Sequence, residues 1–218
     1  ADFMTALVSR YQGRIRYYEL GNEPGYQSAY WLSGSAPDFG QFLKAGYTGA
    51  KKADPNSLIV SGAPLNSATS FFEEAVKSTG GKCYFDVMSM HYLGNHVCGG
   101  DVLRQWITVL EKMGAGNMPL INSEEMNWRG DPRNLQTPAK LIQTHVREAA
   151  LGIDKTFAFD FFRNGSLFGV SAFDYSGAPL PRYAAYRTMT HRLEYATFVA
   201  DLSSANVEAY LFDRQGVP

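Results

Sequence analysis

Short apolar runs alternate with longer segments of helical period along almost the whole chain, and this alternation limits the possible folds more than any other feature. It is typical of parallel βα units, in which each strand is buried on both faces and therefore reads as a continuous apolar run. The sequence predicts an α/β protein. Its five expected strands are Ile15–Leu20, Leu58–Ser61, Phe85–Met90, Leu120–Ser123 and Thr156–Phe161.

Start and stop signals place helices between these strands. Asp38 is interpreted as the N-cap of a helix that stops at Asp54-Pro55, and Thr137-Pro138 begins another helix with proline in its first turn. The opening residues Ala1–Tyr11 also have a helical pattern. Further helices are expected near Ser67–Ser78, Asp101–Met113, Thr137–Leu151 and Pro181–Leu193.

The pattern changes after the last predicted helix. Asn206–Gly216 alternates between apolar and polar residues like an exposed antiparallel strand that ends in a turn. Residues 1–195 are therefore expected to form one α/β domain. Residues 196–218 are expected to be the start of an appended β domain or a C-terminal tail.

Eight βα units close into a barrel whose active site lies at the carboxyl ends of the strands, whereas five units cannot close one. The alternative is an open, doubly wound parallel sheet. That architecture usually carries a glycine-rich phosphate loop after its first strand, and this chain has none there. The favoured fold is a partial (β/α)8 TIM barrel.

Composition narrows the class of protein further. The 218 residues are 45% hydrophobic with a formal net charge of −1, and no basic run offers the footprint that nucleic-acid binding needs. No stretch approaches the ~18 consecutive apolar residues of a membrane span. Cys83 and Cys98 flank a predicted strand that would hold them roughly 20 Å apart, so two free thiols are expected. No nucleic-acid or membrane partner is expected, and the compartment is left unassigned.

Two glutamates follow apolar runs at expected strand ends, Glu23 within Asn22-Glu23-Pro24 and Glu124 within Asn122-Ser-Glu124. Two carboxylates on strand ends are the minimum machinery for cleaving a glycosidic bond. One protonates the leaving oxygen, and the other attacks the sugar or activates water. The pair therefore indicates a glycoside hydrolase that needs no cofactor.

Several segments resemble motifs of the retaining glycoside hydrolases of clan A. Tyr18-Glu-Leu-Gly-Asn-Glu-Pro-Gly25 is similar to their fourth-strand motif, and Pro119-Leu-Ile-Asn-Ser-Glu124 is similar to their seventh-strand motif. His91-Tyr92 resembles the end of the sixth strand. Phe173–Tyr186 resembles an Asp-x-x-Gly-x-Pro-x-Pro-x-Tyr segment that leads into the eighth helix.

This resemblance implies a retaining β-glycoside hydrolase, with Glu23 as acid/base and Glu124 as nucleophile. It also implies substrate-binding roles for Asn22, His91 and Tyr92. The resemblance begins at about the third helix of the barrel, so strands one to three have no counterpart in this chain. The expectation is either a fragment of a longer carbohydrate-active enzyme or a half-barrel that associates as a homo-oligomer through its open edges.

Alternatives remain at this point. A catalytically silent carbohydrate-binding or structural fragment would retain the same carboxylates, and an inverting hydrolase would separate them by 6.5 to 9.5 Å, against about 5 to 5.5 Å for a retaining enzyme. Trp128 is a candidate for stacking on a sugar. Strand alternation favours Glu124 over Glu125 as the inward carboxylate, while Glu19 is interpreted as a structural partner of a basic side chain. No metal is expected, because no dense ligand cluster accompanies His91 and His96.

Overall fold

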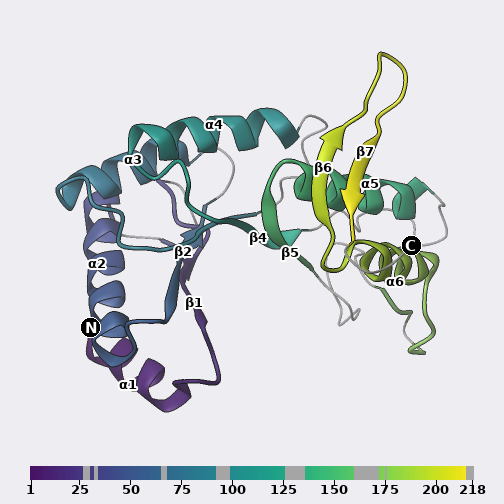
Figure 1. Ribbon diagram of the computed structural model, residues 1–218. Helices are drawn as coiled ribbons and strands as arrows, with labels where there is room; N and C mark the ends of the chain where they lie inside the picture. Colours follow the sequence, from purple (N-terminus) through teal and green to yellow (C-terminus); the bar gives the residue numbers. More distant parts are fainter. Residues whose placement is uncertain are drawn as a thin grey trace. The chain divides into compact units, whose positions relative to one another are not determined.

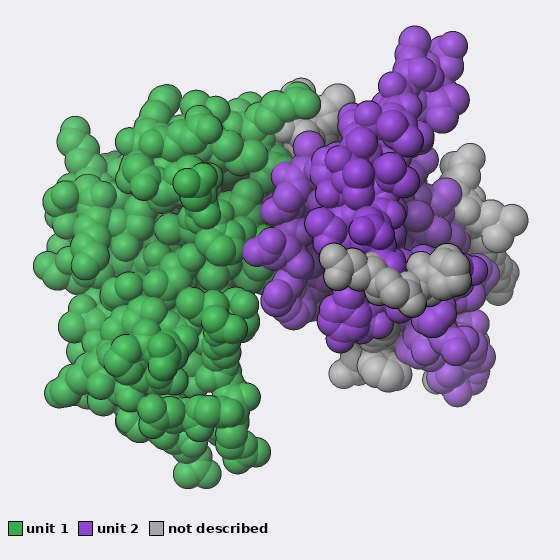
Figure 2. All heavy atoms as spheres, viewed as in Figure 1, with its two compact units in different colours: residues 1–91, 100–123 green, residues 92–99, 124–218 purple. Residues whose placement is uncertain are grey.

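The computed structural model describes residues 1–26, 30–31, 34–64, 68–91, 99–125, 136–159, 172–174 and 176–214. The chain divides into two compact units (Figure 2). The first contains residues 1–91 and 100–123, and the second contains residues 92–99 and 124–218.

Helices and strands alternate through the first part of the chain, as the sequence predicts (Figure 1). In order they are α1 (Asp2–Tyr11), β1 (Tyr17–Asn22), α2 (Ala36–Ala53), β2 (Leu58–Ala63), α3 (Thr69–Ser78), β3 (Met88–His91), α4 (Gly99–Lys112) and β4 (Leu120–Glu125). Strand β4 continues without interruption from residue 123, the last of the first unit, to residue 124.

Neighbouring strands in the chain are also neighbours within the sheets. β1 pairs in parallel with β2, with Tyr18 opposite Ile59. An isolated parallel bridge from Val60 to Val87 then leads from β2 toward β3, and β3, β4 and β5 (Ile153–Ala158) are ordered as neighbours in one sheet. The carboxyl ends of parallel strands lie on one edge of a sheet, so residues after β1 and β2 emerge at the same edge.

The two faces of β1 differ in burial. Tyr18 and Leu20 are buried, whereas the alternate residues Tyr17 and Glu19 are exposed. Helix α2 covers the buried face, and it comes so close that a Cβ on Gly46 would lie 2.6 Å from a Leu20 methyl carbon. A side chain on residue 46 would therefore have to displace the Leu20 methyl group. One face of β1 builds the hydrophobic core, and the other is left for polar side chains.

The core of the first unit is rich in aromatic rings. Phe39, Phe72 and Trp106 are fully buried, and the ring of Phe72 meets that of Trp106 edge to face with centroids 5.6 Å apart. Trp106 lies on α4. Burial of each such side chain contributes about 1.5–3 kcal/mol, so these rings account for much of the packing of α2, α3 and α4.

The start of α2 corrects one prediction. The N-cap is Ser35 and not Asp38, which is the third residue of the helix. Ser35 Oγ accepts a hydrogen bond from the Asp38 N–H, while the Asp38 carboxylate accepts one from the Ser35 N–H at 3.0 Å. This reciprocal capping box satisfies two otherwise unpaired backbone donors, and it explains why an aspartate stands there.

The second unit contains β5, α5 (Gln136–Ala150), α6 (Pro181–Leu193) and a two-stranded antiparallel ribbon. The ribbon pairs β6 (Thr197–Asp201) with β7 (Tyr210–Asp213). The predicted strand at Asn206–Gly216 is thus present but shorter, and its partner β6 was not predicted. Leu141 and Ala172 are fully buried in a small apolar cluster, against which Tyr183 and Tyr186 of α6 pack.

All five predicted core strands are present, with bounds that shift by a few residues. β3 begins at Met88 instead of Phe85 and extends to His91, which is therefore a strand residue. β5 begins three residues earlier than predicted, at Ile153. Among the described residues, none of the helices is both long enough and apolar enough to cross a membrane.

Candidate active site

Glu23 follows β1 in an unusual backbone conformation. Its φ is +45°, and Gly21 two residues earlier has φ +87°. For a residue that is not glycine the left-handed region costs about 1–3 kcal/mol, and such strain persists only where the surroundings enforce it. The Glu23 side chain is turned inward, and the residue is only 7% exposed. The sharp turn after β1 therefore holds a carboxylate inside the protein at an energetic cost.

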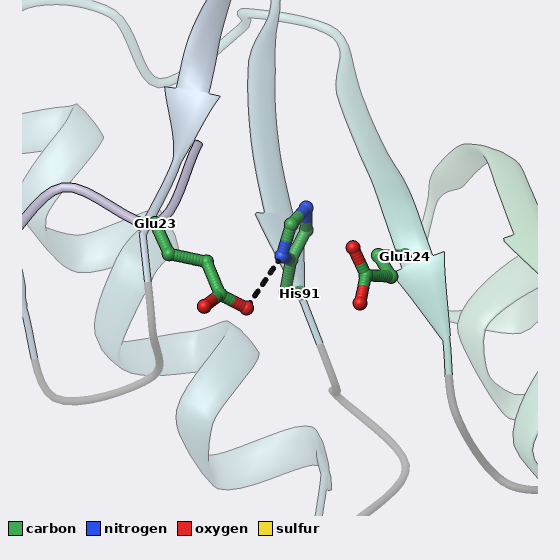
Figure 3. Close-up of side chains that lie close together, drawn as sticks. All are labelled: Glu23, His91 and Glu124. Atoms are coloured by element: carbon green, nitrogen blue, oxygen red, sulfur yellow. Dashed lines mark hydrogen bonds and ion pairs between the residues drawn. The ribbon is translucent and has the colours of Figure 1, made fainter. Parts of the chain in front are cut away.

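His91, the last residue of β3, is the partner of Glu23. Its Nδ1 lies 3.0 Å from Glu23 Oε1, and both side chains are buried (Figure 3). The other ring nitrogen, Nε2, lies 3.0 Å from Ser123 Oγ. The imidazole is therefore held at both ends, and its plane and position are fixed relative to Glu23.

Ser123 is the centre of a second group of contacts. Its hydroxyl donates to Glu19 Oε1 at 3.0 Å and accepts a hydrogen bond of 2.7 Å from the Ser89 hydroxyl. The partner of Glu19 is therefore a serine on β4, which corrects the prediction of a basic partner. The sequence had set Glu19 apart from the catalytic residues, yet the structure connects it to His91 through one hydroxyl.

Glu124 is the residue after Ser123 in β4. Consecutive Cα atoms are 3.8 Å apart, so the contacts of Ser123 with His91 bring the backbone of Glu124 to the same strand end. One carboxylate oxygen of Glu23, one of Glu124 and one ring nitrogen of His91 all lie within 4.8 Å of one another (Figure 3). Glu124 is half-buried, whereas Glu125 is fully buried. The three side chains come from the ends of β1, β3 and β4.

Two carboxylates and an imidazole are also a donor set that a divalent cation can use. Here both ring nitrogens of His91 are already engaged, one by Glu23 and the other by Ser123. A cation would have to replace one of these hydrogen bonds. Acid–base chemistry at the same three groups would not require either hydrogen bond to be replaced. The absence of a metal requirement stays a prediction.

The other predicted site residues are not brought together to the same degree. Asn22 is exposed at the end of β1, beside Glu23 in the chain. Tyr92 and Trp128 lie outside the described residues. In the loop after Glu23, the Tyr26 hydroxyl donates to Glu74 and the ring of Trp31 packs edge to face on Phe39, so both aromatics are used in local packing.

Ser89 and Ser123 were not predicted as members of the site. A signal for them exists in hindsight, since Ser89 and His91 alternate on β3 and therefore share one face of the strand. Serine is common in any sequence, however. Only the contact between strands that are far apart in the chain distinguishes these two serines from others.

The late motif at 173–186 has a structural explanation. Asp174 Oδ1 accepts hydrogen bonds from the Ser176 side chain and from the backbone N–H groups of Ser176 and Ala178, and these contacts lower the pKa of the Asp174 carboxyl. Gly177 has φ +83°, a conformation that favours glycine. Pro181 then stands at the start of α6. The motif is a turn that begins a helix.

Solved structures with similar folds include several glycoside hydrolases. A family 39 glycoside hydrolase from Bacteroides cellulosilyticus matches 98% of this chain at 20% identity with a TM-score of 0.72. A GH39 β-xylosidase from Caulobacter crescentus matches 92% at 17% identity, with a TM-score of 0.69. A glucosidase from Croceicoccus marinus matches 90% at 15% identity, with a TM-score of 0.71. No protein-family model and no curated protein matches the chain.

These matches cover 48%, 51% and 46% of the three solved chains, in the same order. The chain thus spans about half the length of the proteins that it resembles. At identities this low, the similarity establishes the fold alone. The chain is therefore an α/β protein with the fold of about half of a TIM-barrel glycoside hydrolase.

Proposed function

We propose that this chain is a retaining β-glycoside hydrolase in which Glu23 is the acid/base and Glu124 is the nucleophile. The observation that carries the proposal is the grouping of Glu23, His91 and Glu124, with a separation of at most 4.8 Å between the closest of these oxygens and nitrogens. Retaining enzymes hold their carboxyl groups about 5–5.5 Å apart, whereas inverting enzymes need about 6.5–9.5 Å to fit a water molecule. The short separation favours the retaining mechanism.

The reaction proceeds in two steps. In the first, the Glu124 carboxylate attacks the anomeric carbon while the Glu23 carboxylic acid gives its proton to the leaving oxygen, so the glycosidic bond breaks as an ester bond to Glu124 forms. In the second, the Glu23 carboxylate takes a proton from water, whose oxygen attacks the anomeric carbon and releases Glu124. Glu23 must therefore exist in both protonation states.

His91 is suited to accompany Glu23 through both steps. When Glu23 is protonated, Nδ1 can accept its proton in a hydrogen bond, and when Glu23 is ionised, a protonated imidazole can donate to it. The 3.0 Å separation of Nδ1 and Oε1 allows either arrangement. The strained backbone of Glu23 supports a functional role as well, because such strain gathers at active sites.

The substrate class is a β-glycoside, with the sugar still to be identified. The structural neighbours include a protein described as a glucosidase and another described as a β-xylosidase, so glucosides and xylosides come first in a screen. Asn22 is proposed to bind the sugar 2-hydroxyl from its exposed position at the end of β1. Tyr92 and Trp128 remain predicted substrate-binding residues.

Hydrolysis of a panel of nitrophenyl β-glycosides tests the proposal. We expect turnover of at least one glycoside, with retention of anomeric configuration in the first-formed product by NMR. A 2-fluoro glycosyl fluoride should label Glu124, and peptide mass spectrometry locates the adduct. Glu124→Gln should abolish both turnover and labelling, whereas Glu111→Gln, on the exposed face of α4, should retain them. An inverted product, or labelling of Glu125 instead, would contradict the assignment.

A catalytically silent fragment is the second candidate, because the chain spans only about half of its structural neighbours. Such a protein would bind carbohydrate without turning it over. Calorimetric titration with xylo- and gluco-oligosaccharides, performed alongside the hydrolysis assay, distinguishes the two. Binding without hydrolysis, and without labelling of Glu124, would establish the silent alternative.

Homo-oligomerisation is proposed as a way to protect an open sheet. Among the described residues β1 has only β2 as a strand neighbour, and Tyr17 on β1 and Ile15 before it are 40% and 42% exposed. An unpaired strand edge with exposed apolar side chains favours association. Sedimentation equilibrium tests this, and a monomer at all accessible concentrations would contradict it. Residues 196–218 are proposed to form a separate β element, to which the β6–β7 ribbon belongs.

A further inference from the structure

The hydrogen bonds around Ser123 contain information about where the protons of the site lie. A serine hydroxyl has one proton to donate and two lone pairs to accept with, and an ionised carboxylate accepts only. Ser123 Oγ meets three partners: Glu19 Oε1 at 3.0 Å, Ser89 Oγ at 2.7 Å and His91 Nε2 at 3.0 Å. The single Ser123 proton can serve only one of them.

Glu19 takes that proton, because an ionised carboxylate has none to offer in return. Ser89 donates to Ser123 and therefore needs nothing from it. The contact with His91 is then a hydrogen bond only if Nε2 carries a proton and donates it to Ser123. In a neutral imidazole the proton on Nε2 leaves Nδ1 as an acceptor, and Nδ1 is the atom that faces Glu23.

We propose that Glu19 and Ser123 are positioning residues that hold His91 in the tautomer protonated on Nε2, so that Nδ1 accepts the acid proton of Glu23. This proposal rests on the proposed role of Glu23 as acid/base. The opposite tautomer would place a proton on Nδ1 and favour the ionised carboxylate, which cannot protonate a leaving group. An exposed glutamate outside the catalytic pair thereby determines which form of the acid His91 stabilises.

The groups that bear on this bond come from three strands. Glu19 and Glu23 approach His91 from β1, Ser123 and Glu124 from β4, and Ser89 lies on β3 with His91 itself. All the contacts that the proposal uses join Glu19, Glu23, Ser89, His91 and Ser123, which belong to the first unit.

A charge reversal gives the sharpest test. In Glu19→Lys the ammonium group can only donate to Ser123, so the serine proton is free to point at His91 Nε2 and the imidazole is expected to carry its proton on Nδ1. Glu19 is exposed, so the lysine can be accommodated at the surface. Ser89→Ala is the matched control, because it removes a contact to the same hydroxyl without changing which group receives the Ser123 proton.

Nitrogen NMR of histidine-labelled protein reads the tautomer directly and needs no turnover. The chain has four histidines, and a His91→Gln variant identifies the His91 signals. The spectra are compared in a Glu23→Gln background, whose amide cannot ionise and therefore stands in for the carboxylic acid form. At about pH 8, above the ordinary titration range of histidine, we expect a pyrrole-type signal from Nε2 in Glu23→Gln and in Glu23→Gln/Ser89→Ala. In Glu23→Gln/Glu19→Lys the pyrrole-type signal should move to Nδ1. An imidazole protonated on Nδ1 alone in Glu23→Gln, or a tautomer that Glu19→Lys leaves unchanged, would overturn the proposal.

Kinetics give a second readout that a purely structural role would not produce. Glu19→Lys should lower kcat by up to about tenfold for glycosides with poor leaving groups, a fraction of the 10²–10⁴-fold that general acids supply. Glycosides whose leaving group needs no protonation should be little affected. If the protein proves inactive on every glycoside while the NMR result is as expected, the tautomer assignment stands and the proposed function fails.

Discussion

Two of the polar networks among the described residues contrast sharply. In the first unit, Glu23 and His91 are buried at the strand ends. In the second unit, Arg147 of α5 makes a two-pronged contact with Glu208, and the side chains are 41% and 33% exposed. Tyr210 of β7 donates to the same carboxylate at 2.7 Å. The Glu23–His91 pair is shielded from solvent, whereas the Arg147–Glu208 pair is exposed to it.

The difference in exposure determines what each network can do. Between buried groups the direction of each hydrogen bond matters, because a group left without its partner cannot turn to water instead. An exposed ion pair competes with water and salt, so its net contribution to stability is small. The Glu23–His91 network is therefore suited to controlling protons, while the Arg147–Glu208 network links the C-terminal ribbon to α5.

Replacing Glu23 should have the largest effect. Glu23→Gln removes the proton donor and is expected to lower kcat by about 10²–10⁴-fold for glycosides with poor leaving groups, and by less for activated aryl glycosides. Initial-rate kinetics across a series of leaving groups measure this. The exposed Glu111→Gln serves as a control with unchanged rates, and an equal loss for all leaving groups would argue against an acid role.

Equivalent deletions in the two networks should differ in their effect on stability. His91→Phe removes a buried partner of Glu23 and Ser123 and is expected to lower the free energy of unfolding by about 1–3 kcal/mol. Arg147→Met removes an exposed ion pair and should lower it by at most about 1 kcal/mol. Urea unfolding followed by circular dichroism compares them. Equal losses in the free energy of unfolding would mean that burial does not determine how much each network contributes to stability.

The exposed Arg147–Glu208 pair should make a small contribution to the stability of the folded protein, and acid should remove it. The Arg147 guanidinium, through its hydrogen bonds, lowers the pKa of the Glu208 carboxyl. Because the folded-state pKa lies below the unfolded one, the stabilisation is present above the ordinary range of glutamate and is lost as the pH falls through the folded value. Melting temperatures from pH 7 to pH 3 should therefore fall slightly less in Arg147→Met than in the native protein. Parallel curves would show that the ion pair makes no pH-dependent contribution to stability.

The smallest effect is a spectroscopic one at alkaline pH. Burial, together with the hydrogen bond to Glu208, raises the pKa of Tyr210 to about 12. Since the folded-state pKa is raised, the associated stabilisation is present below the ordinary tyrosine value and is lost as the pH rises through the folded value. The difference between ultraviolet titrations of the native protein and Tyr210→Phe should show a phase centred near pH 12. A phase at the ordinary tyrosine pKa would show that Glu208 does not hold the phenol.

The strands and helices were largely readable from the sequence because each leaves a local signal. The apolar runs gave the five strands, and Pro181 and Leu193 bound the last helix as predicted. The N-cap of α2 was misplaced because Ser35 and Asp38 both suit that position, and only the reciprocal hydrogen bonds identify the cap. Strand β6 was not predicted, because it is defined by its pairing with β7. A contact between two segments leaves no local pattern in the sequence.

The sequence by itself determined the alternating α/β architecture and singled out Glu23, Glu124 and His91, because strand-end carboxylates and an apolar period are properties of neighbouring residues. Only the tertiary structure decided that Glu23 pairs with His91, that it adopts a positive φ, and that Ser123 joins His91 to Glu19. These contacts join residues separated by 68, 32 and 104 positions. Such partners are chosen by the packing of strands, and no local propensity specifies them.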